Sequence, residues 1–340
     1  MLARLVTKKW VKWLLILISL GMMVAGVFVW RFANAISQPL EFGADPYVIP
    51  RGTNLNRIAN DLKSKDIISD TLNLRLLAKY KDLGHNIKAG EYQFPDDMNL
   101  EMFLDWISKG KGQIGIKVTI IEGWTFRQMR EQLAKAEKLK QETRDWTDEQ
   151  VMAALGSPEL HPEGQFFPDT YQYLSGESDL TLLKKSFNIM QQKLAEAWAQ
   201  RSEDLQLKTP YEALIMASII EKESQANEEI GQISGVFNNR LKTGMRLQTD
   251  PTVIYGAGDD YKGDITYKHL RTDTPYNTYT RDGLPPTPIS LPGDHALLAA
   301  VQPEETEAYY FVAKGGGKHH FSKTLKEHNA AVKKYILKKN

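Results

Sequence analysis

An uncharged run of eighteen residues near the N-terminus constrains this chain more than any other feature. It extends from Trp13 to Trp30 and reads WLLILISLGMMVAGVFVW. A helix of about 20 apolar residues crosses a bilayer core of about 30 Å, so this run is just long enough to span it. A tryptophan stands at each end, where aromatic side chains favour the membrane interface. We therefore expect a transmembrane helix over residues 13–30.

The charges around this run predict its orientation. Residues 1–12 carry four cationic side chains and no acidic one. Under the positive-inside rule this tail stays in the cytoplasm, and the chain after Arg31 is exported. A cleaved signal peptide is the alternative, because Ala33-Asn34-Ala35 resembles a small-residue cleavage site. The run is longer than a usual signal core and Arg31 interrupts the approach to that site, so a single-span anchor is favoured. Residues 31–44 should then form a short tether.

Composition excludes several classes of function. A chain of 340 residues has room for two compact domains beside the anchor. The net charge of +1 argues against a nucleic-acid partner, which requires a concentrated basic surface. Cysteine is absent, so disulfides, thiolate metal sites and cysteine nucleophiles are excluded.

Residues 45–115 have the pattern of a small module. An extended segment over residues 47–50 precedes a helix with four apolar residues on one face, namely Leu55, Ile58, Ala59 and Leu62. A second helix over 71–81, a strand over 90–94 and a third helix capped by Asn99 should follow.

This order of elements, together with Pro50-x-Gly52-Thr53, resembles a LysM domain. That resemblance implies binding to glycans that contain N-acetylglucosamine. A stalk or packing module without a ligand is the alternative. The residues fit a glycan-binding module and a module without a ligand equally well.

Residues 116–340 should form a mixed α+β domain. A strand over 116–121 precedes two capping boxes, Thr125 with Gln128 and Thr147 with Gln150, each of which starts a helix. Helices then dominate as far as Lys242, after which the chain is rich in proline, glycine and tyrosine, as loop-built binding surfaces are. The glycines of residues 315–317 predict a hairpin turn rather than a phosphate-binding loop.

One helix of this domain presents a candidate acid. It should begin at Thr209, with Pro210 at its first position, and its residues 213–220 are apolar nearly all round, so it should be buried. Glu221 then lies at the exit of the helix, on the face of Ala217 and Ser218. Partial desolvation and the negative end of the helix dipole both favour its protonated form. A glutamate that keeps its proton near neutral pH is what general-acid cleavage of a glycosidic bond requires.

A solvated charge at a helix end, offset by Lys222, is the alternative interpretation of Glu221, and from position alone it would be preferred. Resemblance reverses that preference. The segment ASIIEKES at 217–224 and MRLQTDPTVIYG at 245–256 are similar to the endolytic murein transglycosylases, the MltG or YceG-like family. Further matching stretches occur in the family's order, namely residues 163–164 with 167–171, 276–279, 283–286 with 288–289, 310–312, 320–322 and 327–329. Ser224 departs from the threonine that is common in the first motif.

The resemblance implies a lytic cleavage of the β-1,4 bond between N-acetylmuramic acid and N-acetylglucosamine. Glu221 would protonate the linking oxygen and then, as a carboxylate, take the proton of the muramic C6 hydroxyl as that oxygen attacks C1. The products carry 1,6-anhydro ends, and the reaction limits the length of nascent strands. The resemblance also implies a bacterial plasma membrane, an extracytoplasmic catalytic domain and proximity to peptidoglycan synthases.

Other side chains in the same motifs are weaker candidates for contact with the sugars, and these are Glu223, Gln248, Asp250, Tyr255, Asn277 and Tyr279. Asp250 has two equal interpretations, a carboxylate that stabilises an oxocarbenium-like transition state or an Asx-turn residue before Pro251. We expect no metal and no cofactor, because His319, His320 and His328 lack an acidic cluster of recognised spacing.

Two other functions are compatible with these residues. One is a muramidase that adds water at the same bond and leaves a reducing end. The other is a wall-binding scaffold without catalysis, which uses the LysM-like module.

Overall fold

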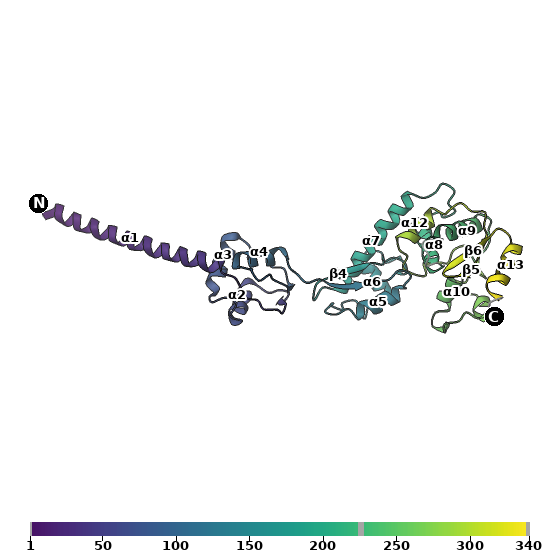
Figure 1. The fold of residues 1–340 in the computed structure, drawn as a ribbon, viewed down its shortest axis with the longest axis horizontal. Coiled ribbons are helices and arrows are strands. Elements are labelled where there is room, and N and C mark those ends of the chain that lie inside the picture. The colour runs from purple at the N-terminus through teal and green to yellow at the C-terminus, as the bar shows by residue number, and fades with distance from the viewer. Residues whose placement is uncertain (1, 224–227, 338–340) are drawn as a thin grey trace. The chain divides into compact units, whose positions relative to one another are not determined.

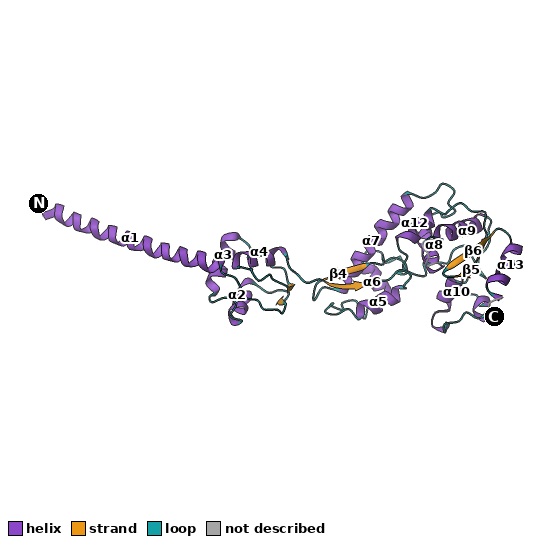
Figure 2. Cartoon of the chain, in the orientation of Figure 1, coloured by secondary structure: helices purple, strands orange, loops and turns teal. Residues whose placement is uncertain are grey.

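The structure, a computed structural model, describes residues 2–223 and 228–337 (Figure 1). The chain divides into two compact units, the first formed by Met1–Ile116 with Leu174–Gly176 and the second by Lys117–Tyr173 with Glu177–Asn340. Helices outnumber strands among the described residues, and the strands form small two-stranded sheets (Figure 2). The fold class is mixed α+β.

The first unit begins with the long helix α1 (Leu2–Ser37). Its segment Trp10–Ser37 contains an 18-residue window with a mean hydropathy of 2.3, and no residue of that window is buried within the protein. This helix has the length and composition needed to cross a membrane, and the predicted span of 13–30 lies inside it.

The predicted tether over residues 31–44 is not a free linker. The helix continues to Ser37, and Phe32 and Ile36 pack against the core of the first unit. Leu40 is buried, and its N–H donates to the carbonyl of Met98 at 2.6 Å. The helix stops just before Pro39, because a proline disfavours helical conformation in the residue that precedes it.

The rest of the first unit has the predicted strand–helix–helix–strand order. Strand β1 (Tyr47–Ile49) pairs antiparallel with β2 (Gly90–Tyr92), and α2 (Leu55–Ser64) and α3 (Thr71–Lys81) lie between them in the sequence. Helix α4 (Leu100–Lys109) follows, capped by the side chain of Asn99 as predicted.

The second unit contains most of the remaining elements. They are β3 (Ile116–Thr119), α5 (Phe126–Ala134), α6 (Asp148–Ala154), β4 (Thr170–Tyr173), α7 (Asp179–Ala199), α8 (Pro210–Glu223), α9 (Ile230–Lys242), α10 (Asp250–Ala257), the short 3-10 helix η1 (Gly258–Asp260), α11 (Tyr267–Arg271), α12 (Asp294–Val301), β5 (Tyr310–Gly315), β6 (Lys318–Ser322) and α13 (Leu325–Tyr335). Both predicted capping boxes, at α5 and α6, are present. Strand β3 pairs with β4, and β5 pairs with β6 around the predicted glycine turn.

Helix α8 is the centre of this unit. Every residue from Ala213 to Ile220 is buried, and the helix contacts α7, α9, α10 and α12. The all-round burial follows from its all-round apolar sequence. A helix held on every side keeps its C-terminal end, and the charged residues there, in a fixed position.

Candidate active site

The start of α8 follows local rules. The N–H of Glu212 donates to the hydroxyl of Thr209 at 3.1 Å, and Pro210 occupies the first helical position. Proline is tolerated there because its missing N–H would have no partner within the helix. The register of α8 is thereby set at its first turn.

At the other end of α8, Glu221 is partly buried against the segment that leads into α12. Its Oε2 accepts the N–H of Gly293, the N-cap residue of α12, at 3.0 Å. One turn earlier, the hydroxyl of Ser218 accepts the N–H of Ile289 at 3.0 Å, and its carbonyl accepts the hydroxyl of Ser290 at 3.0 Å. The face on which the sequence placed Glu221 is therefore the face that packs on residues 289–293.

Two glycines lie beside this carboxyl, and one of them makes room for a second carboxyl. A Cβ at Gly293 would lie 1.9 Å from Oε1 of Glu122, so a second carboxyl already occupies that space. A Cβ at Gly123 would lie 3.8 Å from Cγ of Glu221. Glu122, in the turn after β3, and Glu221, at the end of α8, thus both lie against the backbone at Gly293.

The surroundings favour the protonated form of Glu221. Burial raises its pKa above the usual value for a glutamate, and the like charge of Glu122 adds to this effect. The Gly293 N–H, Lys222 and His295 act in the opposite direction without cancelling it. The N-terminus of α12 stabilises the carboxylate, an opposing effect that the sequence did not reveal.

Glu223 points away from Glu221, as the helical angle predicted. Its carboxyl accepts a hydrogen bond from the hydroxyl of Thr249, just before α10. Burial raises the pKa of Glu223 to about 7, and the neighbouring charge of Asp250 contributes to the rise. The two glutamates therefore belong to different surroundings, one at the start of α12 and one at the start of α10.

Three of the candidate residues surround the start of α10. Gln248 is exposed and has a left-handed backbone with φ of 49°. The exposed carboxylate of Asp250 accepts the hydroxyl of Tyr279 at 2.6 Å. Burial and that carboxylate together raise the pKa of Tyr279. Asp250 acts on Glu223 and Tyr279 rather than on Glu221, which gives no support to its interpretation as a second catalytic carboxylate beside Glu221.

Asn277 lies where it cannot serve a substrate directly. Its side chain is 1% exposed, and its amide donates to three carbonyls of the loop, those of His269, Leu270 and Thr272. Its own oxygen accepts the N–H of Tyr279 at 2.9 Å. These bonds hold the loop in shape and give no support to the expectation that Asn277 contacts a sugar.

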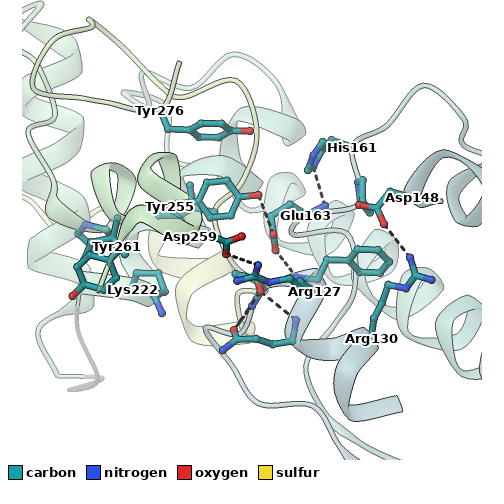
Figure 3. Close-up of a pocket in the computed structure, with 18 of the residues that line it drawn as sticks. Arg127, Arg130, Asp148, His161, Glu163, Lys222, Tyr255, Asp259, Tyr261 and Tyr276 are labelled. Atoms are coloured by element: carbon teal, nitrogen blue, oxygen red, sulfur yellow. Dashed lines mark hydrogen bonds and ion pairs between the residues drawn. The ribbon is translucent and has the colours of Figure 1, made fainter. Parts of the chain in front are cut away.

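Tyr255 lines a cavity that the sequence did not predict (Figure 3). The cavity measures about 1320 Å³ and is formed by α5, α6, α10 and neighbouring loops. Glu163, which is 4% exposed, lies in its wall. Its oxygens accept the N–H of Phe126 at 2.9 Å and the hydroxyl of Tyr255 at 3.1 Å. Burial raises the pKa of Glu163 to about 7, and burial with the Glu163 charge raises that of Tyr255.

Lys222 connects this cavity to the helix end that carries Glu221. Lys222 lines the cavity, and its amino group donates to the carbonyl of Gly123 at 3.2 Å. Glu221 approaches Gly123 from the same helix end, whereas Glu163 binds the N–H of Phe126, three residues further on. The sequence contained two signals for Glu163: it belongs to a stretch that matches the family, and Phe166 and Phe167 follow it closely.

The three C-terminal histidines have structural partners. Nδ1 of His319 lies 2.9 Å from a Glu229 carboxylate oxygen, and the ring of His328 stacks on Tyr310. The ring of His320 lies beside that of Tyr335. Within residues 2–223 and 228–337, no group of three or more acidic, histidine or cysteine side chains is arranged to hold a metal. Ser224, which departs from the family motif, lies outside the described residues.

Comparisons with known proteins agree on one family. The model of the YceG-like family matches residues 47–334. A Bacillus subtilis protein named endolytic murein transglycosylase is 31% identical over 338 residues, which cover 94% of this chain and 92% of that protein. A Streptococcus pneumoniae protein of the same name is 26% identical, and the match covers 95% of this chain but 65% of that protein. A crystal structure of a YceG-like protein from Listeria monocytogenes is 32% identical and covers 84% of this chain and 98% of its own, with a TM-score of 0.53. This chain therefore belongs to the YceG-like family.

Proposed function

We propose that this chain is an endolytic transglycosylase that cleaves the glycan strands of bacterial peptidoglycan, with Glu221 as its acid. One observation carries the assignment of the acid. Glu221 is held at a fixed helix end, partly buried, with a raised pKa and with one oxygen anchored by the Gly293 N–H. The activity itself is supported by the names of the Bacillus and Streptococcus relatives.

In the proposed reaction Glu221 serves twice. Its proton passes to the oxygen that links N-acetylmuramic acid to N-acetylglucosamine, and the bond from C1 to that oxygen breaks. The resulting carboxylate takes the proton of the muramic C6 hydroxyl while O6 bonds to C1. No water is consumed, a 1,6-anhydro end forms, and Glu221 regains its proton. One carboxyl is enough for this cycle, whereas a glycosidase that adds water ordinarily uses two.

A hydrolytic muramidase is the second candidate, and Glu122 is the observation that favours it. Its carboxyl contacts Gly293, the residue that donates to Glu221. A second carboxylate near the acid could activate a water molecule. The two reactions differ in their products, since hydrolysis leaves a reducing end.

Helix α1 and the family support a location at a membrane. We propose a single span in the bacterial plasma membrane, with residues 1–12 in the cytoplasm and residues 116–340 outside as the catalytic domain. The enzyme would then act on nascent strands close to the peptidoglycan synthases. In the first unit, residues 45–115 have the strand–helix–helix–strand order of a LysM domain, which supports glycan binding by this module.

Mass spectrometry of the fragments released from uncrosslinked peptidoglycan tests the assignment. The full-length protein in detergent is compared with Glu221→Gln and with Glu196→Gln, a matched change at an exposed glutamate of α7 that does not line the cavity. Loss of general-acid catalysis costs about 10²- to 10⁴-fold, so anhydro ends should vanish with the first variant and persist with the second. Reducing ends would favour the muramidase. Binding to glycan without any product from the wild type would favour a scaffold.

A further inference from the structure

The cavity at Glu163 combines aromatic rings with polar groups. Tyr255, Tyr261 and Tyr276 line it, and the rings of Tyr255 and Tyr276 meet edge to face at 4.8 Å. A sugar ring has an apolar face of C–H bonds that packs on an aromatic ring, and hydroxyls and amides at its rim that need hydrogen-bond partners. At about 1320 Å³ the cavity exceeds the volume of a typical small-ligand pocket, about 300–1,000 Å³, so a chain of several sugars fits it better than a single small molecule.

Glu163 fixes one wall of this cavity. One of its oxygens accepts the N–H of Phe126, which belongs to the first turn of α5 and has no partner within that helix. The other accepts the hydroxyl of Tyr255 from α10. The carboxyl therefore joins two elements and sets the direction in which the Tyr255 hydroxyl points (Figure 3).

We propose that this cavity binds the part of the glycan strand next to the bond that Glu221 cleaves, and that Glu163 is a positioning residue that orients the hydroxyl of Tyr255 for the sugar. The inference rests on the proposed function and adds a binding site to it. Lys222 supports the connection, because it lines the cavity and adjoins Glu221 in the sequence.

The ionisation of Glu163 decides what Tyr255 offers to the cavity. As a carboxylate, Glu163 only accepts, so the Tyr255 proton points toward it and the phenol oxygen is left to accept an N–H or O–H of the sugar. As a carboxylic acid, Glu163 can donate to the phenol oxygen, and the tyrosine then turns its proton elsewhere. Because burial raises the pKa of Glu163 to about 7, this exchange occurs near neutral pH.

Other charged groups face Glu163 from the surrounding elements. Arg127 of α5 is paired with Asp259 at 3.0 Å, and Asp148 of α6 raises the pKa of Glu163. Nδ1 of His161 accepts the N–H of Glu163 at 3.1 Å. These groups remain when Glu163 is replaced. The difference in the pH dependence of binding between proteins with and without Glu163 therefore reports the titration of Glu163 alone.

The test measures binding rather than turnover, in full-length protein that carries Glu221→Gln. The dissociation constant for uncrosslinked glycan strands is measured between pH 5.5 and 8.5 for this parent. The same is done after adding Tyr255→Phe, Glu163→Gln or Tyr171→Phe. Tyr171 is the matched control, a buried tyrosine whose hydroxyl donates to the Phe167 carbonyl at 2.6 Å and which is not part of the cavity. Melting temperatures are recorded for every variant.

Tyr255→Phe should weaken binding at pH 8 by about fivefold, the value of one hydrogen bond of about 1 kcal/mol. In the parent, affinity should fall as pH drops from 8 to 6, and this dependence should disappear with Glu163→Gln and with Tyr255→Phe. Tyr171→Phe should leave both the affinity and its pH dependence unchanged.

Affinities of the Tyr255 and Glu163 variants within twofold of the parent, at every pH, would overturn the proposal. So would a pH dependence that survives the loss of Glu163. If Glu163→Gln does not fold, Tyr255→Phe decides alone, because it removes a single oxygen atom. A failure of the proposed function appears separately, as wild-type product formation by Glu221→Gln, and does not affect the binding measurement.

Discussion

Replacing Glu163 by glutamine should make the stability of the second unit less dependent on pH. In the folded protein burial raises the pKa of Glu163 to about 7, against a reference value of 4.5 for an unperturbed glutamate. The folded state therefore holds this proton more tightly than the unfolded chain does. The resulting stabilisation is complete below about pH 4.5 and is lost as pH rises through 7.

The size of this effect follows from the two pKa values. Each unit of difference corresponds to about 1.4 kcal/mol. Because the unfolded chain is already mostly ionised at pH 5, the contribution of Glu163 to the free energy of unfolding should drop by about 2.5 kcal/mol between pH 5 and pH 8. Glutamine does not titrate, and it replaces one acceptor oxygen at a cost of about 1 kcal/mol. The variant should thus be less stable than the wild type at pH 5 and more stable at pH 8.

Urea unfolding of the full-length protein in detergent, at both pH values, measures this difference. The signal is the protection of α8 amides against a short deuterium pulse, because the buried residues 213–220 report on the second unit alone. Glu131→Gln serves as the control, since it removes an exposed glutamate from the wall of the same cavity. Equal changes with pH in the wild type and in the Glu163 variant would show that the buried carboxyl does not titrate between pH 5 and 8.

Three further predictions concern side chains around the acid and its loops. Gly293→Ala should displace the flexible carboxyl of Glu122, and the pKa of Glu221 should then fall because a like charge has moved away. The descending alkaline limb of the kcat/KM profile should shift toward lower pH. The melting temperature should stay within about 2 °C of that of the wild type. An unchanged pH profile would show that Glu122 has no influence. Asn277→Ala should destabilise the unit by about 2–3 kcal/mol, because three loop carbonyls lose their donor, and calorimetry with a change below about 1 kcal/mol would contradict the role of these bonds in holding the loop. Ser218→Ala should cost about 1–3 kcal/mol in urea unfolding, since it leaves a buried backbone N–H without its acceptor, and a neutral result would argue against the observed packing of α8 on residues 289–293.

Several features of this protein follow from rules that act between neighbouring residues of the chain. The membrane-spanning length of the apolar run depends only on composition. The capping boxes at Thr125 and Thr147, and the start of α8 at Thr209, depend on hydrogen bonds between residues three positions apart. The burial of α8 and the divergence of Glu221 from Glu223 follow from helical geometry and from an apolar surface on every side.

Contacts between residues that are far apart in the sequence could be seen only in the tertiary structure. Glu221 and Gly293 are 72 positions apart, and Glu163 and Tyr255 are 92 apart. Their contacts depend on how α8, α10 and α12 pack, and no periodic pattern encodes that. Packing is also the reason why residues of the expected tether join the core of the first unit, and why the side chain of Asn277 bonds to loop carbonyls. The pKa of a titratable group depends on the burial and the neighbouring charges that packing gives it. The sequence could therefore identify Glu221 as a candidate acid from its place in a helix. The cavity at Glu163 depends on tertiary packing and could be seen only in the structure.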